Sequence, residues 1–415
     1  MKFNLAFGKK TMDVNIEDNN VQEVLHANDV QVCLKGKDEV ARAINNPIGT
    51  KKLREIVSPK EKVVIVTSDI TRPMPSRLVL SLVIHELEMA GVAHSDISIV
   101  FALGIHRKHT TAEMKYLVGD DIYQKIKCMD SDIDDCVNLG HTKNMTPIDI
   151  FRPVVEADRR ICLGNIEYHY FAGYSGGAKA IMPGVSTKAA IQNNHKKMVE
   201  INACAGNLLT NPVRADLEEA INYIPIDFIV NVVLNEDKEI IKAVAGHYID
   251  AHREGCRYLD QLYKIKINAK ADIVIASAGG FPKDINLYQA QKTLDNASHA
   301  VKKGGIIILV ASCKEGFGEA TFEEWMINAK KPLELIDKIK TEFILGGHKA
   351  AAIASVLQQN RVFLVSELDN HIVSSMFFEP YHSIQDAYDD ALSIMGNNAQ
   401  TIIIPHGGSV LPIIQ

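Results

Sequence analysis

Short runs of apolar, mostly β-branched residues recur along the chain, and helical patterns follow many of them. The clearest runs are Lys62–Thr67, Asp96–Leu103, Arg160–Leu163, Phe228–Leu234, Ile273–Ala276, Gly305–Val310, Arg361–Val365 and Thr401–Ile404. Continuous apolar runs, without in–out alternation, are typical of strands covered on both faces, and such strands form parallel sheets. Helical patterns such as Ser76–Ala90 and Pro332–Lys340 supply the crossovers. The pattern therefore predicts an α/β protein with mainly parallel sheets.

The length of the chain predicts more than one domain. At 415 residues it exceeds what one ordinary core contains. The charged stretch Lys264–Lys270 leads into a fresh apolar run and marks the expected boundary. We expect an N-terminal catalytic and cofactor-binding α/β domain over 1–267 and a smaller α/β domain over 268–403 that closes the site. The active-site cleft is expected between them, and the tail 404–415 is a candidate to pack back on the first domain.

Composition removes several classes of protein. Hydrophobic residues make up 47% and charged residues 23%, as in globular domains, and the net charge of −6 offers no cationic field for nucleic acid. The N-terminus lacks the apolar core of a signal peptide, and no apolar stretch is long enough to span a bilayer, so we expect a cytoplasmic protein without a membrane partner. Seven cysteines without a C-x-x-C pair argue against a disulfide framework, a zinc ribbon or an iron–sulfur cluster.

The segment after the first clear strand reads SDITRP. Asp69 and Arg72 are expected to pair, which would fix the guanidinium for a carboxylate or phosphate. The alternative is a capped turn that ends the strand and begins a helix, with Ser76 as its N-cap. Because ligands in open α/β sheets bind beyond the carboxyl ends of strands, we favour the functional interpretation.

The next strand ends in ALGIHR. His106 on this glycine-containing loop is a candidate acid or base near neutral pH, although a structural role explains a single histidine equally well. His109 lies three residues further on and is expected at the surface.

The segment from 164 to 195 holds the most chemistry. Gly176 and Gly177 would let backbone amides approach an anion, and Lys179 follows them. The Walker sequence G-K-[ST] and the dinucleotide fingerprint G-x-G-x-x-G are both absent. The segment therefore holds a lysine against a glycine loop, with His169 before it and His195 after it. The alternative is a tight turn with two solvated histidines.

A fourth segment, NLYQAQKT, begins a helical pattern in the second domain. Gln289 and Lys292 are three residues apart and share one helix face, which could clamp a carboxylate. Without further context, solvation of an exposed helix explains them better.

Together these segments resemble the nickel-dependent lactate racemase family, a group of nickel-pincer-nucleotide 2-hydroxyacid racemases and epimerases. SDITRP, ALGIHR, HYFAGYSGGAKAIMPGV, NNH and NLYQAQKT follow the family's order at about its spacing, over nearly the whole chain. Each segment alone is a weak signal, whereas the set is specific.

The resemblance implies a role for each candidate residue. Lys179 would hold the cofactor covalently, His195 would bind the metal, and His106 and His169 would be the catalytic pair. The implied cofactor-binding positions are Asp69, Ile70, Thr71, Arg72, Gly176 and Gly177. The implied substrate-binding positions are Arg72, Gln289 and Lys292.

The implied activity is that of an isomerase, a racemase or epimerase of a 2-hydroxy acid. The reaction would proceed by reversible hydride transfer from the α-carbon to a lysine-tethered nickel-pincer nucleotide (nickel pyridinium-3,5-bisthiocarboxylic acid mononucleotide), with two histidines as general acid and base. Nitrogen and sulfur donors suit nickel in a planar site. Protein made in a host without the biosynthetic enzymes is expected to lack the cofactor. The implied partners are the small-molecule substrate and the cofactor-biosynthesis proteins; the oligomeric state stays open.

One departure from the family bears on the substrate. Lactate-specific members have a tryptophan in the second-domain pocket, but the single tryptophan of this chain, Trp325, comes too early. The corresponding stretch contains His348 and Lys349, which would make the pocket more polar and favour an acid larger or more charged than lactate.

Two other functions stay open at this point. A nicotinamide-dependent hydroxyacid dehydrogenase would also pair a histidine with an arginine, but it needs the dinucleotide fingerprint that is absent. A non-catalytic protein that binds the nickel nucleotide or a sugar acid would keep Lys179 and His195, and would not need both His106 and His169.

Overall fold

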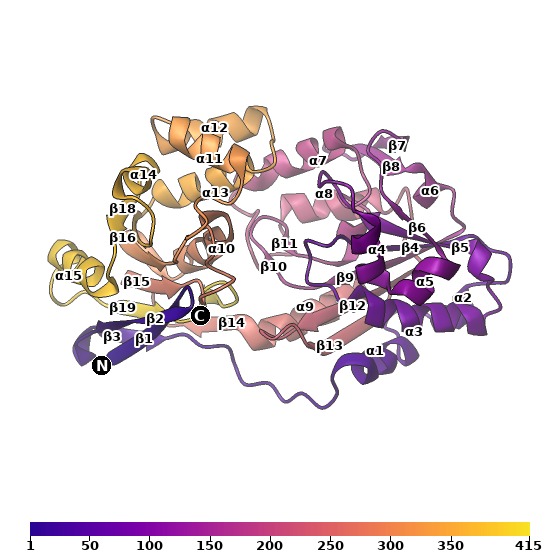
Figure 1. Cartoon of the computed structure of the whole chain (residues 1–415), viewed down its shortest axis with the longest axis horizontal. Helices are drawn as coiled ribbons and strands as arrows, with labels where there is room; N and C mark the ends of the chain where they lie inside the picture. The colour runs from indigo at the N-terminus through magenta and orange to yellow at the C-terminus, as the bar shows by residue number, and fades with distance from the viewer. The chain divides into compact units, whose positions relative to one another are not determined.

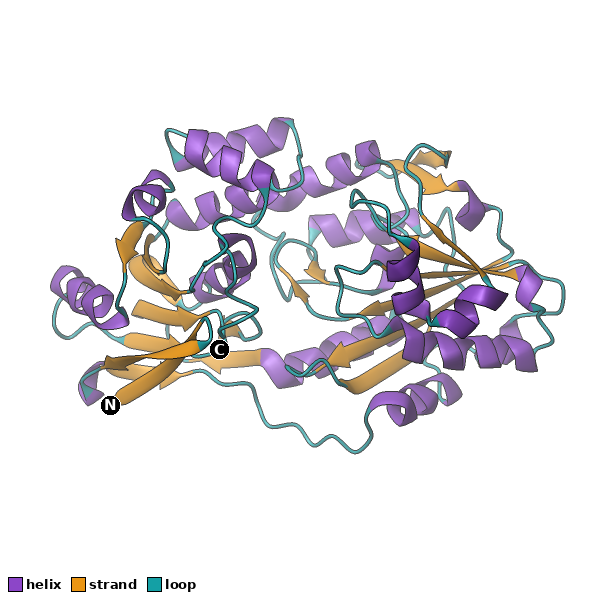
Figure 2. Ribbon diagram, in the orientation of Figure 1, coloured by secondary structure: helices purple, strands orange, loops and turns teal.

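The chain divides into two compact units, which are described one at a time. The computed structural model describes all 415 residues (Figure 1). The central unit comprises Val30–Asp260, and the terminal unit comprises Met1–Asp29 together with Gln261–Gln415. Helices and strands alternate through most of both units (Figure 2), as expected for an α/β protein.

A six-stranded sheet organises the central unit. Its strands are β4 (Val63–Ser68), β5 (Ile97–Ala102), β6 (Lys127–Asp130), β9 (Arg159–Asn165), β12 (Phe228–Leu234) and β13 (Ile240–Gly246). The order across the sheet is β13-β12-β9-β4-β5-β6. All neighbours are parallel except β12 and β13.

The helices of the central unit lie before, between and after its strands along the chain. They are α1 (Gly36–Asn45), α2 (Leu53–Ile56), α3 (Ser76–Met89), α4 (Thr111–Val118), α5 (Asp120–Lys125), α6 (Arg152–Val155), α7 (Lys188–His195), α8 (Pro212–Ala220) and α9 (Asp250–Tyr263), with the 3-10 turns η2 (His94–Asp96), η3 (Gly177–Ala180) and η4 (Lys196–Val199). In α3, Val79, Val83 and Leu87 recur every four residues and pack with Ile65 and Ile161 of the sheet.

Two hairpins complete the central unit. One pairs β7 (Cys136–His141) with β8 (Pro147–Phe151), and the other pairs β10 (Tyr168–His169) with β11 (Gly173–Tyr174). The second hairpin follows β9 directly, so it carries His169 from the end of that strand.

The terminal unit contains a second six-stranded sheet, which is entirely parallel. Its strands are β3 (Val21–Val24), β15 (Ala271–Ser277), β16 (Val301–Val310), β17 (Arg361–Val365), β18 (Glu379–Tyr381) and β19 (Thr401–Ile404), in the order β18-β17-β16-β15-β19-β3. An antiparallel hairpin of β1 (Lys2–Phe7) and β2 (Lys10–Asn15) and a parallel pair of β14 (Lys264–Ile267) and β20 (Leu411–Ile414) accompany it.

The remaining helices belong to the terminal unit. They are η1 (Asp18–Asn20), α10 (Leu287–Ser298), α11 (Ala320–Asn328), α12 (Pro332–Thr341), α13 (Gly347–Leu357), α14 (Asn370–Ser375) and α15 (Ile384–Met395). None of the helices in either unit combines the length and the apolar surface that crossing a bilayer requires.

The predicted fold class is confirmed as mixed α/β with mainly parallel sheets. Each of the eight apolar runs overlaps a strand of one of the two large sheets. The sequence predicted Ser76 as the N-cap of α3, but the N-cap is Pro75. The Ser76 hydroxyl instead lies 3.0 Å from the hydroxyl of Thr67, which holds the helix start against β4.

The units differ from the domain ranges expected from the sequence, 1–267 and 268–403. Residues 1–29 belong with the C-terminal residues, because β3 pairs with β19 and because Leu5 and Phe7 enter the apolar core that contains Ile275. The tail 404–415 also stays in the terminal unit, where β20 pairs with β14. The N-terminal hairpin buries apolar side chains in the terminal unit, and this burial accounts for the different boundary. The short strands of the hairpin do not indicate this burial in the sequence.

We expect a core substitution in the N-terminal hairpin to destabilise the terminal unit. Leu5 is 2% exposed, so Leu5→Ala should lower the free energy of unfolding by about 2–4 kcal/mol through lost burial and a residual cavity. Denaturant unfolding measures the loss, and amide exchange at Ile275 locates it. Lys10→Ala, at an exposed position, is the control and should change the free energy by less than about 0.5 kcal/mol. Faster exchange at Ile65 of β4, with Ile275 unaffected, would contradict the assignment of the hairpin.

Candidate active site

Three predicted segments follow strands at the carboxyl edge of the central sheet. The chain leaves β4 for β5 and β6 on one side, and later adds β9 and β12 on the other side. This reversal at β4 is a topological switch point, where ligands bind in open α/β sheets. The loops that carry Arg72, His106 and His169 begin at the ends of β4, β5 and β9. The topology therefore directs all three loops to one edge of the sheet.

His106 pairs with Asp69. The Nδ1 atom of His106 and Oδ2 of Asp69 form a short hydrogen bond, and Oδ1 accepts the backbone N–H of Thr71 at 3.0 Å and its hydroxyl at 2.6 Å. Burial opposes the charged carboxylate, but the hydrogen bond and charge of His106 outweigh it and hold the pKa of Asp69 below its ordinary value. The ionised carboxylate keeps a proton on Nδ1, so His106 exchanges protons through Nε2. The expected pair between Asp69 and Arg72 does not form, because His106 and Thr71 occupy both carboxylate oxygens.

His169 lies in an aromatic environment. Its ring meets Phe171 edge-on, with 4.4 Å between centroids, and its Nδ1 accepts the backbone N–H of Ala172 at 3.2 Å. Burial first, and then the charges of Lys179 and Arg72, lower the pKa of His169 well below its ordinary value. The ring is therefore neutral near pH 7, and it carries its proton on Nε2 because Nδ1 is an acceptor.

Lys179 lies next to His169. Its Nζ is 3.4 Å from Nε2 of His169 and 5.9 Å from the centroid of Phe171. Burial, followed by the charges of Arg214 and Arg72, lowers the pKa of the Lys179 amine well below its ordinary value. An uncharged amine is a nucleophile, whereas an ammonium is not. The position therefore suits covalent attachment of a ligand.

Arg214 organises the loop in front of Lys179. The guanidinium is fully buried and donates to the backbone carbonyls of Ala172, Tyr174 and Gly176. The nearest carboxylate, that of Glu218, lies 3.9 Å away. The cation thus serves to hold loop carbonyls, and its charge acts on Lys179. No sequence signal marked this residue, because an arginine in α8 cannot be told from a solvated helix position.

The two glycines of the loop are required by close packing. Both have positive φ, +75° at Gly176 and +59° at Gly177. A Cβ at Gly176 would lie 2.8 Å from Oδ1 of Asn231, and one at Gly177 would lie 3.0 Å from the ring of His252. The N–H of Gly177 donates to Oδ1 of Asn231 at 2.8 Å. This amide, a candidate for binding an anion on sequence grounds, is therefore engaged within the protein.

His195 is the last residue of α7, and its ring orientation is fixed by Asn194, which Val213 and Asp216 hold in turn. Nδ1 lies 2.9 Å from Oδ1 of Asn194, whose amide nitrogen donates to Val213 O at 3.1 Å and to Asp216 Oδ2 at 2.9 Å. Two acceptors on one side lock the Asn194 amide, because a flipped amide would place oxygen against oxygen. Nδ1 of His195 is therefore the donor, and Nε2 carries the lone pair that a metal would need.

Phe171 brings these side chains together. Its ring contacts His169 at 4.4 Å and His195 at 4.8 Å between centroids, and Lys179 Nζ lies over it. The loop of His106 joins the same region, since the N–H of Gly104 donates to Gly184 O at 2.9 Å. Ring contacts and a backbone bond thus connect the loop of His106 with the segment that carries His169, Lys179 and His195.

The residues present fit a nickel nucleotide better than a metal held by protein alone. No group of three or more histidine, cysteine or carboxylate side chains could enclose a metal ion. His195 offers one imidazole donor, so a metal there needs donors from a bound ligand. The uncharged amine of Lys179 lies beside the same Phe171 ring and could tether such a ligand.

His109 is buried against the loop that follows β4, which the sequence did not reveal. It was expected at the surface, but its side chain is 1% exposed. Nδ1 bonds Asp130 Oδ1 at 2.5 Å, and Nε2 accepts the backbone N–H of Ile70 at 3.1 Å. Its spacing of three residues from His106 was the only available signal.

The other predicted residues lie in the terminal unit. Gln289 and Lys292 are both exposed on α10, as their spacing indicated. His348 and Lys349 of α13 are buried, and Lys349 donates to the carbonyl of Tyr288 while its Nζ lies 4.0 Å from the ring centroid of that residue. Trp325 packs at the start of the same helix, where a Cβ on Gly347 would meet its ring at 2.7 Å.

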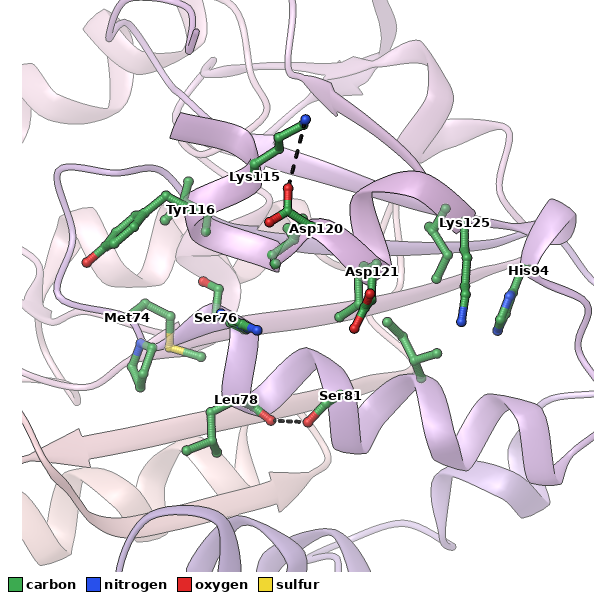
Figure 3. Close-up of a pocket in the computed structure, with 18 of the residues that line it drawn as sticks. Met74, Ser76, Leu78, Ser81, His94, Lys115, Tyr116, Asp120, Asp121 and Lys125 are labelled. Carbon is green, nitrogen blue, oxygen red and sulfur yellow. Dashed lines mark hydrogen bonds and ion pairs between the residues drawn. The ribbon is translucent and has the colours of Figure 1, made fainter. Parts of the chain in front are cut away.

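A groove elsewhere on the central unit is separate from these residues. It has a volume of about 1050 Å³ and lies between α3 and the α4–α5 segment (Figure 3). Met74, Ser76, Tyr116 and Asp121 are among its lining residues, and none of the predicted site residues lines it.

Comparison with known proteins gives one consistent result. Residues 7–206 match the family model of the lactate racemase N-terminal domain, and residues 266–412 match that of the lactate racemase C-terminal domain. The chain is 34% identical over 420 residues to the lactate racemase of Thermoanaerobacterium thermosaccharolyticum, and 32% identical over 419 residues to that of Lactiplantibacillus plantarum. Each alignment covers 98% of both proteins.

Solved structures agree with these relatives. The lactate racemase apoprotein from Thermoanaerobacterium thermosaccharolyticum superposes with a TM-score of 0.91 at 33% identity, covering 99% of this chain and all of that one. A Thermotoga maritima protein superposes with a TM-score of 0.67 at 18% identity, covering 92% of this chain and all of that one, which shows a shared fold.

We expect the amine of Lys179 to stay reactive at a pH where ordinary lysines are protonated. Its lowered pKa means that the neutral form persists to lower pH, so acylation of the apoprotein should reach its plateau well below pH 10.4, about the ordinary value. Peptide mass spectrometry across a pH series gives the midpoint. Arg72→Ala removes a nearby positive charge and should move the midpoint upward, whereas Arg77→Ala on the exposed face of α3 should not. A midpoint near 10.4 in the unsubstituted chain would contradict the assignment.

Proposed function

Because the chain belongs to the lactate racemase family, we propose that it is a racemase or epimerase of a 2-hydroxy acid. The observation that carries the proposal is the pairing of His106 with Asp69 and of His169 with Lys179 at the switch point of one sheet. Its named relatives make lactate the first substrate to test. The buried polar residues His348 and Lys349 add malate and sugar acids to the test.

The proposed cofactor is the nickel-pincer nucleotide. Lys179 would hold it covalently and His195 would bind its metal, in keeping with an uncharged amine and an imidazole whose Nδ1 proton is engaged by Asn194. The loops at 69–72 and 176–177 would contact it. When bound, this group supplies an acceptor for the hydride of the substrate's α-carbon.

The two histidines would exchange the hydroxyl proton of the substrate. The enantiomers of a 2-hydroxy acid present their hydroxyl groups in different directions, so each needs its own base. Asp69 accepts the Nδ1 hydrogen bond of His106, so Nε2 is the ring nitrogen that would exchange the hydroxyl proton. His169 is neutral near pH 7 because of its burial and neighbouring charges, and its Nε2, the nitrogen that Ala172 does not engage, would carry the exchanged proton.

Arg72 would bind the substrate carboxylate. The side chain is exposed, and its charge acts on both His169 and Lys179, which supports a location beside them. A guanidinium binds a carboxylate through two parallel hydrogen bonds and so restricts rotation of the substrate. Gln289 and Lys292 of α10 stay candidates for substrate binding, in keeping with their exposure on one helix face.

Replacing either histidine should abolish most of the racemisation. With cofactor-loaded protein, His106→Asn and His169→Asn should each lower kcat by about 10²- to 10⁴-fold, because each removes one proton-transfer group. The assay follows the loss of optical rotation of single enantiomers of lactate, malate and a sugar acid. His85→Asn, whose side chain is 65% exposed, is the control and should leave kcat unchanged.

Two results of the same assay would count against the proposal. Full racemisation by either loaded single variant would remove that histidine from the mechanism. Net reduction of added nicotinamide cofactor by the unsubstituted protein would indicate a dehydrogenase instead. A clear preference for lactate would keep the racemase and overturn the expectation of a more polar pocket.

Protein from a host that makes the cofactor should carry it on Lys179. We expect an added mass on the peptide that contains Lys179 and about one nickel per chain, by intact mass and elemental analysis. Lys179→Ala should lose the added mass, because the nucleophile is gone. Lys188→Ala, at an exposed position on α7, should retain both mass and nickel. A mass on a different residue would exclude Lys179 as the attachment point.

A further inference from the structure

His109 and Asp130 form a second buried histidine–carboxylate pair beside the site. The side chains are 1% and 7% exposed. Asp130 ends β6, and its two oxygens accept the Nδ1 proton of His109 at 2.5 Å and the backbone N–H of His109 at 2.8 Å. The ring of Phe101 packs edge-on against the imidazole at 5.1 Å. The imidazole is therefore held on several sides and has one fixed orientation.

The second ring nitrogen reaches the loop after β4. Nε2 of His109 accepts the backbone N–H of Ile70 at 3.1 Å. An N–H donor requires a lone pair on Nε2, so the proton of the neutral ring is on Nδ1, where Asp130 accepts it. Asp130 thus selects the tautomer that can bind Ile70.

Ile70 is the residue between the two functional groups of its loop. Asp69 precedes it and bonds His106, and Arg72 follows two residues later. Thr71 folds back onto Asp69, which closes the turn, but that bond lies within the loop and does not attach it to the sheet. The contact with His109 attaches the loop to the end of β6.

We propose that His109 and Asp130 are positioning residues that set the loop of Asp69 and Arg72 relative to the catalytic histidine. The proposal rests on the proposed function. Neither residue needs to touch substrate: they act through the backbone of Ile70. Displacement of a positioned group by about 1 Å can cost about 100-fold in rate.

Two substitutions at His109 separate its contact with Asp130 from its contact with Ile70. In His109→Gln the side-chain oxygen can stand where Nε2 stood and still accept the Ile70 N–H. In His109→Asn the shorter side chain can bond Asp130 and cannot reach Ile70. We expect about a 10- to 100-fold loss of kcat/KM in His109→Asn, in line with the loss of a supporting hydrogen bond, and a loss below about 3-fold in His109→Gln.

A third variant tests the tautomer without changing shape. Asp130→Asn has the same outline but only one acceptor oxygen, while His109 presents two N–H donors to it. If the amide nitrogen of the new side chain faces Nδ1 of His109, the ring proton moves to Nε2. The Nε2–H then faces the N–H of Ile70, and the hydrogen bond between them is lost. We expect this variant to lose kcat/KM like His109→Asn. His94→Asn, at a partly exposed position of η2, is the control and should match the unsubstituted protein.

Amide exchange at Ile70 in the apoprotein gives a readout that needs no activity. Exchange should be at least about 10-fold faster in His109→Asn and Asp130→Asn than in His109→Gln, because only the last keeps an acceptor. Unchanged exchange and unchanged kcat/KM in His109→Asn overturn the proposal. Equal losses in His109→Gln and His109→Asn also overturn it, since they indicate a general packing role. If the loaded unsubstituted protein does not racemise, the proposed function fails while the exchange data still decide the role of His109.

Discussion

The arrangement of the site depends on burying an amine next to a fixed cation. Lys179 lies over the ring of Phe171, and Arg214 is fully buried one loop away, with its nearest carboxylate, that of Glu218, 3.9 Å distant. Two neighbouring positive charges in a poorly solvated space oppose each other, and the guanidinium cannot lose its proton. The pKa of the amine is therefore lowered, so its uncharged form persists to lower pH. This balance converts an ordinary lysine into a nucleophile without any dedicated base.

Arg214 also connects this electrostatic effect to the shape of the loop. Its N–H groups hold three backbone carbonyls of the segment that leads to Lys179. The loop can approach so closely only because Gly176 and Gly177 have no side chains to collide with Asn231 and His252. The same contacts that shape the loop thus bring the charge that acts on its lysine. Replacing Arg214 would therefore change the shape of the loop and the pKa of Lys179 together.

The sequence predicted the strands better than it predicted their partners. Buried parallel strands carry continuous apolar runs, so β4, β5, β9 and β12 could be found from local pattern alone. The N-terminal hairpin could not be assigned to its unit, because pairing between β3 and β19 joins residues almost four hundred positions apart. The candidate residues at strand ends were likewise visible. Arg214, His109 and Asp216 were not, because a buried polar partner looks like any solvated residue until the fold shows its neighbours.

The two histidines of the pair are held by opposite kinds of partner, and this difference has a chemical consequence. His106 donates a hydrogen bond from Nδ1 to a carboxylate, which fixes its tautomer and leaves the lone pair on Nε2. His169 accepts the backbone N–H of Ala172 at Nδ1. If this ring were protonated, its Nδ1–H would face that N–H, and the hydrogen bond would be lost. Burial and neighbouring positive charges, that of Arg72 among them, lower the pKa of His169 further. On the proposed function, a substrate carboxylate bound by Arg72 would offset part of this positive charge, so binding of the substrate would raise the basicity of His169.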